Sequence, residues 1–246
     1  MLIFAKGFNF DVFGLHRSCV TAIRLTVLKK NGILSDMNSN PIQKIYVFAA
    51  KYPFDVLSGY MPPARQAEID CCKDVNVRQS KYYAFKLLEI ALRDVYRKQL
   101  CDVNFVLDVN GKWSCDVCKF SLTHSGCIVA VALSDKPVGL DVEKVDISRF
   151  DVKLQNRILC KNEQAFAWQL PDERRALYAN KLWTAKEALF KRDGGKTFVP
   201  EQTDATEQKW QTVTVNDGKT QYYLTTAGQC DCFVEYRMFA VNLDER

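Results

Sequence analysis

The order of the strand-like and helix-like segments is the sequence feature that most limits the fold. Strand-like runs come in clusters, and helical stretches separate these clusters instead of alternating one for one with single strands. This order favours an α+β fold over a doubly wound parallel sheet. The expected strands lie at 42–50, 103–109, 113–120, 120–123, 128–133, 141–145, 210–215, 221–225, 230–236 and 238–241; the expected helices lie at 64–72, 77–100, 150–170 and 171–191.

We expect two similar fused halves in a pseudo-twofold arrangement. Each half would hold a small antiparallel sheet packed on a long helix, the first half over 37–145 and the second over 146–246. Residues 1–36 differ in charge from the rest of the chain, because their basic residues outnumber their acidic ones. Met37 then begins a segment with the pattern of a domain start. We therefore expect 1–36 to be an N-terminal extension outside the functional core.

Composition excludes several classes of protein. No apolar run approaches the roughly 20 residues that span a bilayer, so no membrane association is expected. The net charge of +5, from 34 basic and 29 acidic residues, suits an enzyme that handles polyanionic ligands or acidic protein partners. It does not by itself indicate nucleic acid, and none is expected as a partner.

The cysteines indicate a reducing compartment. Ten of them are scattered along a long chain, which favours free thiols and a cytoplasmic location over a disulfide framework. Cys115 and Cys118 have a spacing that zinc sites use, but neither a second such pair nor a histidine at ligand spacing accompanies them.

A pair of acidic residues ends the last strand of the first half. Asp141 and Glu143 lie two positions apart in an extended segment, so both side chains leave the same face. Taken alone, such a pair is usually a solvated strand edge.

A helix of the second half carries a second candidate. Trp183, Glu187 and Lys191 share one helical face, with Lys186 one position over. An exposed ion pair beside a core tryptophan would explain this pattern equally well if it stood alone.

A histidine between two hydroxyl residues forms the third element. Thr123, His124 and Ser125 end an apolar strand, where hydroxyl, imidazole and backbone N–H groups suit anionic oxygens. A serine hydrolase is less attractive, since the Gly-x-Ser-x-Gly turn is missing and adjacent strand residues point apart.

In this order, Leu122-Thr-His-Ser125, Val138-Gly-Leu-Asp-Val-Glu143 and Leu182-Trp-Thr-Ala-Lys-Glu-Ala-Leu-Phe-Lys191 resemble the signature of the 4′-phosphopantetheinyl transferases. The similarity is greatest to the long, monomeric, Sfp-like branch, and it covers about residues 45–242. Members of that family move the phosphopantetheine arm of coenzyme A onto a serine of an apo acyl or peptidyl carrier protein. The reaction depends on Mg²⁺ and releases adenosine 3′,5′-bisphosphate.

The resemblance implies a role for each motif residue. Asp141, Glu143 and Glu187 would hold Mg²⁺, and Glu187, or a water that it orients, would deprotonate the carrier serine. Lys186 and Lys191 would bind the pyrophosphate and assist catalysis.

The remaining implied contacts are to coenzyme A. His124 would contact one of its phosphates beside Thr123, whose position is commonly a serine in the family. Arg65 and Lys81 fall where basic residues bind the 3′-phosphate. Lys112 would reach the nucleotide, although the family's Gly-Lys-Pro is here Gly111-Lys-Trp113.

Two rival functions stay open at this point. The alternative is a metal-dependent phosphohydrolase acting on a nucleotide or a coenzyme-A-like pyrophosphate, which would need no carrier protein. A further rival is a non-enzymatic nucleotide or nucleic-acid binder, in which loss of the Asp141 carboxylate would leave binding intact or improve it.

Overall fold

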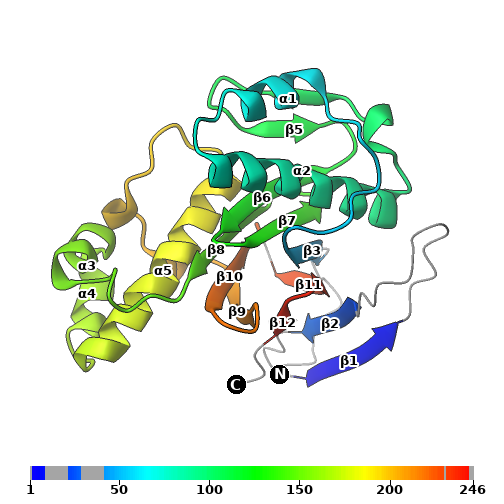
Figure 1. Cartoon of the computed structure of the whole chain (residues 1–246). Helices are drawn as coiled ribbons and strands as arrows, with labels where there is room; N and C mark the ends of the chain where they lie inside the picture. The colour runs from blue at the N-terminus through cyan, green and yellow to red at the C-terminus, as the bar shows by residue number, and fades with distance from the viewer. Residues whose placement is uncertain (1, 9–21, 29–41, 230, 244–246) are drawn as a thin grey trace.

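The computed structural model describes residues 2–8, 22–28, 42–229 and 231–243 (Figure 1). The helices are α1 Pro63–Asp70, α2 Val75–Tyr96, α3 Val152–Ile158, α4 Lys161–Ala167 and α5 Asp172–Asp193, with short 3₁₀ turns at Leu100–Asp102, Pro200–Gln202 and Ala205–Glu207. The strands are β1 Leu2–Phe8, β2 Ala22–Leu28, β3 Gln43–Lys51, β4 Phe105–Leu107, β5 Trp113–Cys115, β6 Lys119–Ser125, β7 Ile128–Ser134, β8 Gly139–Lys144, β9 Trp210–Asn216, β10 Gln221–Ala227, β11 Cys232–Phe239 and β12 Asn242–Leu243.

The first sheet has the strand order β1-β2-β11-β3-β7-β6 and is covered by α2 on one face. Alternation along β3 separates the two faces: Phe48 and Ala50 pack toward α2, while Ile45, Val47 and Ala49 pack on the opposite side. Because both faces are covered, the strand is almost continuously apolar.

The second sheet, in the order β12-β9-β10-β8, packs against that opposite side of the first sheet. Even-numbered residues of β8, Leu140 and Val142, enter the shared core between the sheets. The odd-numbered residues face α5, which lies along β8 and β10 (Figure 1). This alternation decides which residues of β8 meet the helix.

A row of side-chain hydroxyls joins the two sheets where β6 approaches β8. Ser121, Thr123 and Ser125 accept hydrogen bonds from the backbone N–H groups of alternate β8 residues, at 3.0, 3.2 and 3.2 Å. These hydroxyls satisfy backbone donors that a neighbouring strand would otherwise satisfy. The strand that we expected to offer hydroxyls to phosphate thus uses them to connect the sheets.

The expected α+β class is confirmed, with most elements close to their predicted bounds. The predicted hairpin at 103–120 forms, but its second strand is interrupted by a bend over 116–118. The break expected between strands at 230–236 and 238–241 is wrong, because β11 runs unbroken from Cys232 to Phe239 and ends where Ala240 takes a φ of 52°. Residue 230 lies outside the described residues.

The last long strand also lies in an unexpected place. β11 pairs parallel with β3 in the first sheet, so the expected C-terminal antiparallel sheet forms from β9, β10 and β12 with β8 and does not include β11. The division into halves at 145 stays a prediction, but the structure shows that this division does not separate the two sheets.

The N-terminal region contributes two described strands. β1 and β2 pair antiparallel, and β2 also pairs with β11, so both extend the first sheet at its edge. Whether 1–36 is dispensable stays a prediction. In the part of the chain that the structure describes, no helix has both the length and the apolar character of a membrane span.

Candidate functional site

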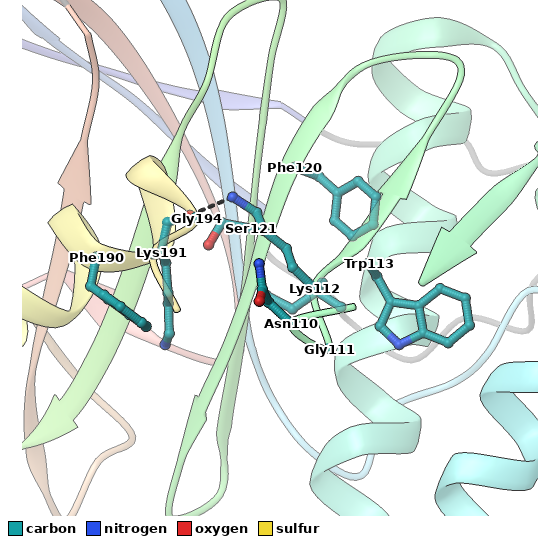
Figure 2. A pocket seen from close by; sticks show the side chains of 11 residues that line it. Asn110, Gly111, Lys112, Trp113, Phe120, Ser121, Phe190, Lys191 and Gly194 are labelled. Carbon is teal, nitrogen blue, oxygen red and sulfur yellow. Dashed lines mark hydrogen bonds between the residues drawn. The ribbon is translucent and has the colours of Figure 1, made fainter. Parts of the chain in front are cut away.

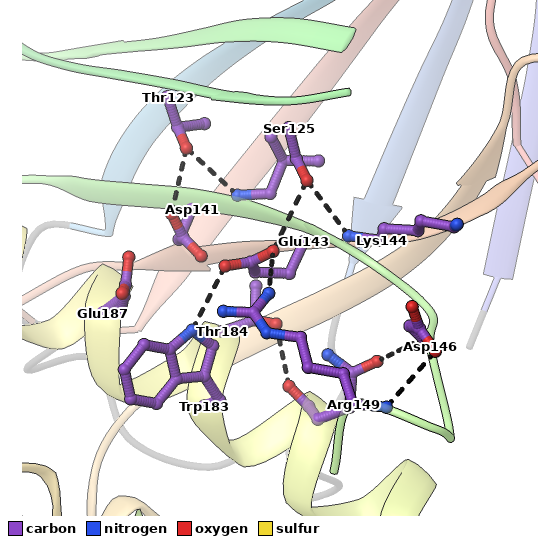
Figure 3. A network of polar contacts seen from close by, with 12 residues as sticks. Thr123, Ser125, Asp141, Glu143, Lys144, Asp146, Arg149, Trp183, Thr184 and Glu187 are labelled. Carbon is purple, nitrogen blue, oxygen red and sulfur yellow. Dashed lines mark hydrogen bonds and ion pairs between the residues drawn. The ribbon is translucent and has the colours of Figure 1, made fainter. Parts of the chain in front are cut away.

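A very close approach between β8 and α5 positions the acidic residues. A β-carbon added at Gly139 would lie 1.7 Å from the carbonyl oxygen of Ala188 in α5, so only glycine fits there. Asp141 and Glu143 follow on the same face and therefore lie against the helix that carries Glu187 (Figure 3).

Asp141 is the buried centre of the cluster, with 2% of its surface exposed. Its Oδ1 accepts hydrogen bonds from Lys191 Nζ at 2.6 Å and from the Thr123 hydroxyl at 2.9 Å. Its Oδ2 is buried without a hydrogen-bond partner. A buried carboxylate oxygen without a donor is costly unless a ligand or cation completes it.

Glu143 is held at both oxygens. Trp183 Nε1 donates to Oε1 at 3.2 Å, while Arg149 and the Ser125 hydroxyl contact Oε2 at 3.2 and 3.4 Å (Figure 3). Burial and the charge of Asp141 raise its pKa. These contacts fix the orientation of the Glu143 carboxylate beside Asp141. A bound cation would stabilise its charged form.

Glu187 has the most perturbed carboxyl group of the site. Burial and the neighbouring carboxylate of Asp141 raise its pKa to about 7, and Lys191, 3.9 Å away, offsets this only in part. A carboxyl group with this pKa can both accept and release a proton near neutral pH.

Lys191 and His124 supply positive and neutral donors beside these acids. Burial acts to lower the pKa of Lys191, but the charges of Asp141 and Glu187 raise it, so its ammonium stays protonated. His124 lies on β6, where partial burial and the charge of Lys191 lower its pKa. The imidazole is therefore largely neutral at physiological pH.

The upstream basic residues gather around Glu68 of α1. Arg65 and Lys81 contact its carboxylate at 2.6 and 2.8 Å, and Trp113 Nε1 donates to it at 2.9 Å. Burial acts to raise the pKa of Glu68, but hydrogen bonds from Lys81 and Trp113 hold it at about 2. The Lys81 side chain keeps 29% of its surface exposed, against 6% for Arg65, so Lys81 is the more available to a ligand.

Lys112 connects the β4–β5 hairpin to the end of α5. Its ammonium donates to the carbonyl oxygen of Lys191 at 2.5 Å, and burial lowers its pKa. Both lysines line a cavity of about 230 Å³ together with Trp113, Phe120 and Phe190 (Figure 2). The cavity lies next to the carboxylate cluster, because Lys191 contributes to both.

Lys186 does not join this cluster. Its side chain is fully buried on another face of α5, where it pairs with Glu163 at 2.5 Å and donates to the carbonyl oxygens of Ile158 and Pro200 at 2.7 and 2.8 Å. In this structure its ammonium contacts protein groups alone, and its contact with the pyrophosphate stays a prediction. The Thr123 hydroxyl is engaged with Asp141 and Val142, and its contact with coenzyme A stays a prediction.

The donor set fits a hard divalent cation. Asp141, Glu143 and Glu187 offer only carboxylate oxygens, which Mg²⁺ prefers, and the orphaned Oδ2 of Asp141 lacks a partner that a cation would supply. In this structure the Lys191 ammonium, 2.6 Å from Asp141 Oδ1, neutralises the charge of the Asp141 carboxylate.

A second acidic group lies elsewhere. Among the described residues, the group of three possible ligands whose ligand atoms all lie within 4.8 Å of one another is Cys160, Glu163 and Asp204, outside the motifs. The Lys186 ammonium already pairs with Glu163 there, so this group is a structural ion pair. The carboxylates of Asp141, Glu143 and Glu187 do not all lie within 4.8 Å of one another, so a bound cation would have to draw them together.

Sequence reasoning missed several residues that build the site. Arg149 and Ser125 orient Glu143, and no spacing rule pointed to either as its partner. Gly139 and Trp183 lie within the motifs, but the sequence suggested no role for Gly139 and only a core position for Trp183. The glycine two positions before Asp141 was the available signal, since glycine inside a strand marks a close backbone approach.

The fold and the site together define an α+β protein with a carboxylate–lysine cluster next to a basic cavity, an arrangement suited to phosphate-bearing ligands. Residues 137–237, from just before β8 into β11, match the model of the 4′-phosphopantetheinyl transferase superfamily. The resemblance predicted from the motifs is confirmed by this match.

Curated relatives carry the same family name. The chain is 31% identical over 111 residues to the 4′-phosphopantetheinyl transferase psf-1 of Bacillus pumilus, covering 44% of this chain and 47% of that protein. It is 31% identical over 81 residues to the transferase gsp of Aneurinibacillus migulanus, covering 33% of each. It is 27% identical over 81 residues to Sfp of Bacillus subtilis (strain 168), covering 33% and 35%. The aligned parts thus span half or less of these relatives.

Proposed function

We propose that this protein is a Mg²⁺-dependent 4′-phosphopantetheinyl transferase. It would move the phosphopantetheine arm of coenzyme A onto a serine of an apo acyl or peptidyl carrier protein and release adenosine 3′,5′-bisphosphate. The observation that carries the proposal is the convergence of Asp141 and Glu143 from β8 with Glu187 and Lys191 from α5. We further propose that it acts as a monomer in the cytoplasm.

The chain's own residues account for the main needs of the reaction. The attacking serine hydroxyl must lose a proton, and Glu187, or a water that it orients, would accept that proton. Lys191 lies between Asp141 and Glu187, so its ammonium neutralises charge that gathers on the bridging phosphate oxygen. The neutral imidazole of His124 donates a hydrogen bond to a phosphate of coenzyme A.

The rest of coenzyme A would follow the basic surface of the first half. Lys112 and Lys191 line the cavity beside the cluster, and Lys81 and Arg65 lie close enough to His124 to lower its pKa. These groups form a positive path from the cluster toward α1 that suits the 3′-phosphate.

Asp141, Glu143 and Glu187 would hold Mg²⁺. When bound, the ion neutralises pyrophosphate charge and lowers the pKa of coordinated water. The orphaned Oδ2 of Asp141 and the raised pKa values of Glu143 and Glu187 support this assignment, because each would be relieved by a cation.

The test incubates the protein with coenzyme A, Mg²⁺ and a panel of apo carrier proteins, followed by intact-mass spectrometry of each carrier. The expected result is a carrier heavier by one phosphopantetheine arm, dependent on Mg²⁺. Glu187→Gln should abolish transfer while coenzyme A binding, measured by calorimetry, persists.

Two outcomes would overturn the proposal. Hydrolysis of coenzyme A with no gain of mass on any carrier would favour the phosphohydrolase. Near-normal transfer by the Glu187→Gln variant would remove Glu187 as base and metal ligand. Glu173→Gln, at the exposed start of the same helix, is the matched control and should leave transfer unchanged.

A further inference from the structure

Cys115 and Cys118 form a feature that the proposed transfer reaction does not use. They bracket the bend that interrupts the strand between β5 and β6, with Cys115 ending β5 and Cys118 just before β6. Asn104 clamps this bend from outside, because its backbone N and side-chain Nδ2 donate to the Asp116 carboxylate at 3.2 and 2.9 Å. The separation of the two cysteines is therefore held by the structure.

The two residues are in contact and differ in exposure. Cys115 Sγ donates a hydrogen bond to the Cys118 carbonyl oxygen at 3.4 Å, so the Cys115 sulfur lies against the backbone of Cys118. Cys115 is partly exposed, whereas Cys118 is buried, with 8% of its surface exposed. A partly exposed cysteine thus lies directly against a buried one.

The surroundings favour a thiolate on the outer sulfur. The hydrogen bond from Cys118, followed by backbone N–H groups of Cys118 and Val117, lowers the pKa of Cys115 to about 6, although burial opposes the shift. The same hydrogen bond, and then burial, raise the pKa of Cys118. At neutral pH the reachable sulfur is therefore the nucleophilic one.

A metal does not explain the pair. Structural zinc sites need four ligands. Among the described residues, the group of three possible metal ligands within mutual reach is centred on Glu163 and includes neither Cys115 nor Cys118. Two neighbouring thiols without further ligands are suited to exchange chemistry instead.

We propose that Cys115 and Cys118 are a redox-active dithiol that small-molecule disulfides oxidise to an intramolecular disulfide. The Cys115 thiolate attacks one sulfur of the small disulfide, which forms a mixed disulfide and releases one thiolate. Cys118 then loses its proton and attacks Cys115 Sγ, which closes the protein disulfide and releases the second thiolate. Two protein thiols and one disulfide become one protein disulfide and two small thiols.

Closure of this ring gives little stabilisation, because the loop holds very few residues. The disulfide should therefore be readily reversed by an excess of the reduced small thiol.

The test uses the full-length reduced protein in glutathione buffers of graded oxidised-to-reduced ratio. After acid quenching and alkylation of free thiols, the peptide containing 115 and 118 is examined by mass spectrometry. The expected product is lighter than the dithiol peptide by two hydrogen atoms and carries no alkyl group, and excess reduced glutathione restores the dithiol.

Rates and variants separate this mechanism from general thiol oxidation. At pH 6 oxidised glutathione should react with Cys115 about tenfold faster than with the exposed Cys101, since the gain in thiolate fraction exceeds the loss of intrinsic nucleophilicity. Cys118→Ser should accumulate the mixed disulfide at Cys115. Cys115→Ser should leave Cys118 unmodified.

The proposal is overturned if exposed cysteines become glutathionylated while the 115–118 peptide stays a dithiol. It is overturned equally if Cys115 and Cys101 react at the same rate. Both readouts come from the unmodified sequence, so they stand even where a serine variant does not fold.

Discussion

Replacing Lys186 by methionine tests whether this residue supports the structure or binds phosphate. In the structure its ammonium has no exposure and makes one ion pair with Glu163 and two hydrogen bonds to backbone carbonyls. Methionine fills similar space but leaves the Glu163 carboxylate buried with only the backbone donors of Cys160 and Ala205. Removing one partner of a buried ion pair costs about 3–5 kcal/mol.

Urea unfolding monitored by tryptophan fluorescence measures this cost. For a slope of about 3 kcal/mol per molar, the midpoint of Lys186→Met should fall by about 1 M or more. Adding Glu163→Gln should recover part of the loss, because no buried charge is then left. The exposed Lys196→Met is the control and should change the unfolding free energy by less than about 0.5 kcal/mol. A Lys186→Met protein of normal stability that no longer binds coenzyme A would refute the structural assignment.

Three further predictions concern the contact between β6, β8 and α5. Gly139→Ala forces a β-carbon into the Ala188 carbonyl and should cost at least about 1–3 kcal/mol, seen as a lower melting temperature, whereas Gly59→Ala, which meets nothing within 4 Å, should be nearly neutral. Thr123→Val leaves the Val142 N–H and Asp141 without the hydroxyl and should lower the free energy of unfolding in urea by about 1–3 kcal/mol, while Thr123→Ser should retain most of the stability; equal loss in both would contradict the hydroxyl's role. Glu187 has its folded-state pKa raised from 4.5 to about 7, so the folded state binds the extra proton between these values and stability should fall as pH rises from about 4.5 to 7 in chelator-treated protein. Unfolding curves measured across this range should be flatter for Glu187→Gln, on the order of 2 kcal/mol in total, and an unchanged pH profile would count against the shift.

The sequence predicted the elements of the site better than their contacts. Alternation along a strand placed Asp141 and Glu143 on one face, and helical spacing placed Glu187 with Lys191, because both follow from local geometry. The same spacing left Lys186 one position over, and only the packing of α3 and α4 against α5 shows that it is buried.

Long-range pairing was the part that the sequence could not reveal. The alternation of β11 is equally compatible with a hairpin partner and with a distant parallel one, since it records only which faces are buried. The roles of Ser121, Thr123 and Ser125 as acceptors for β8 depend on two sheets meeting, which no local pattern encodes.

The place of β11 beside β3 has a consequence for how the protein is made. A ribosome adding about 5–20 residues per second needs roughly 10–40 s to travel from β3 to β11. During that interval β3, whose side chains are mostly buried in the finished protein, has one edge without its final neighbour. An apolar strand with a free edge can pair with another chain. The nascent chain is therefore open to misassembly at this edge throughout that interval, and the arrival of β11 ends the exposure.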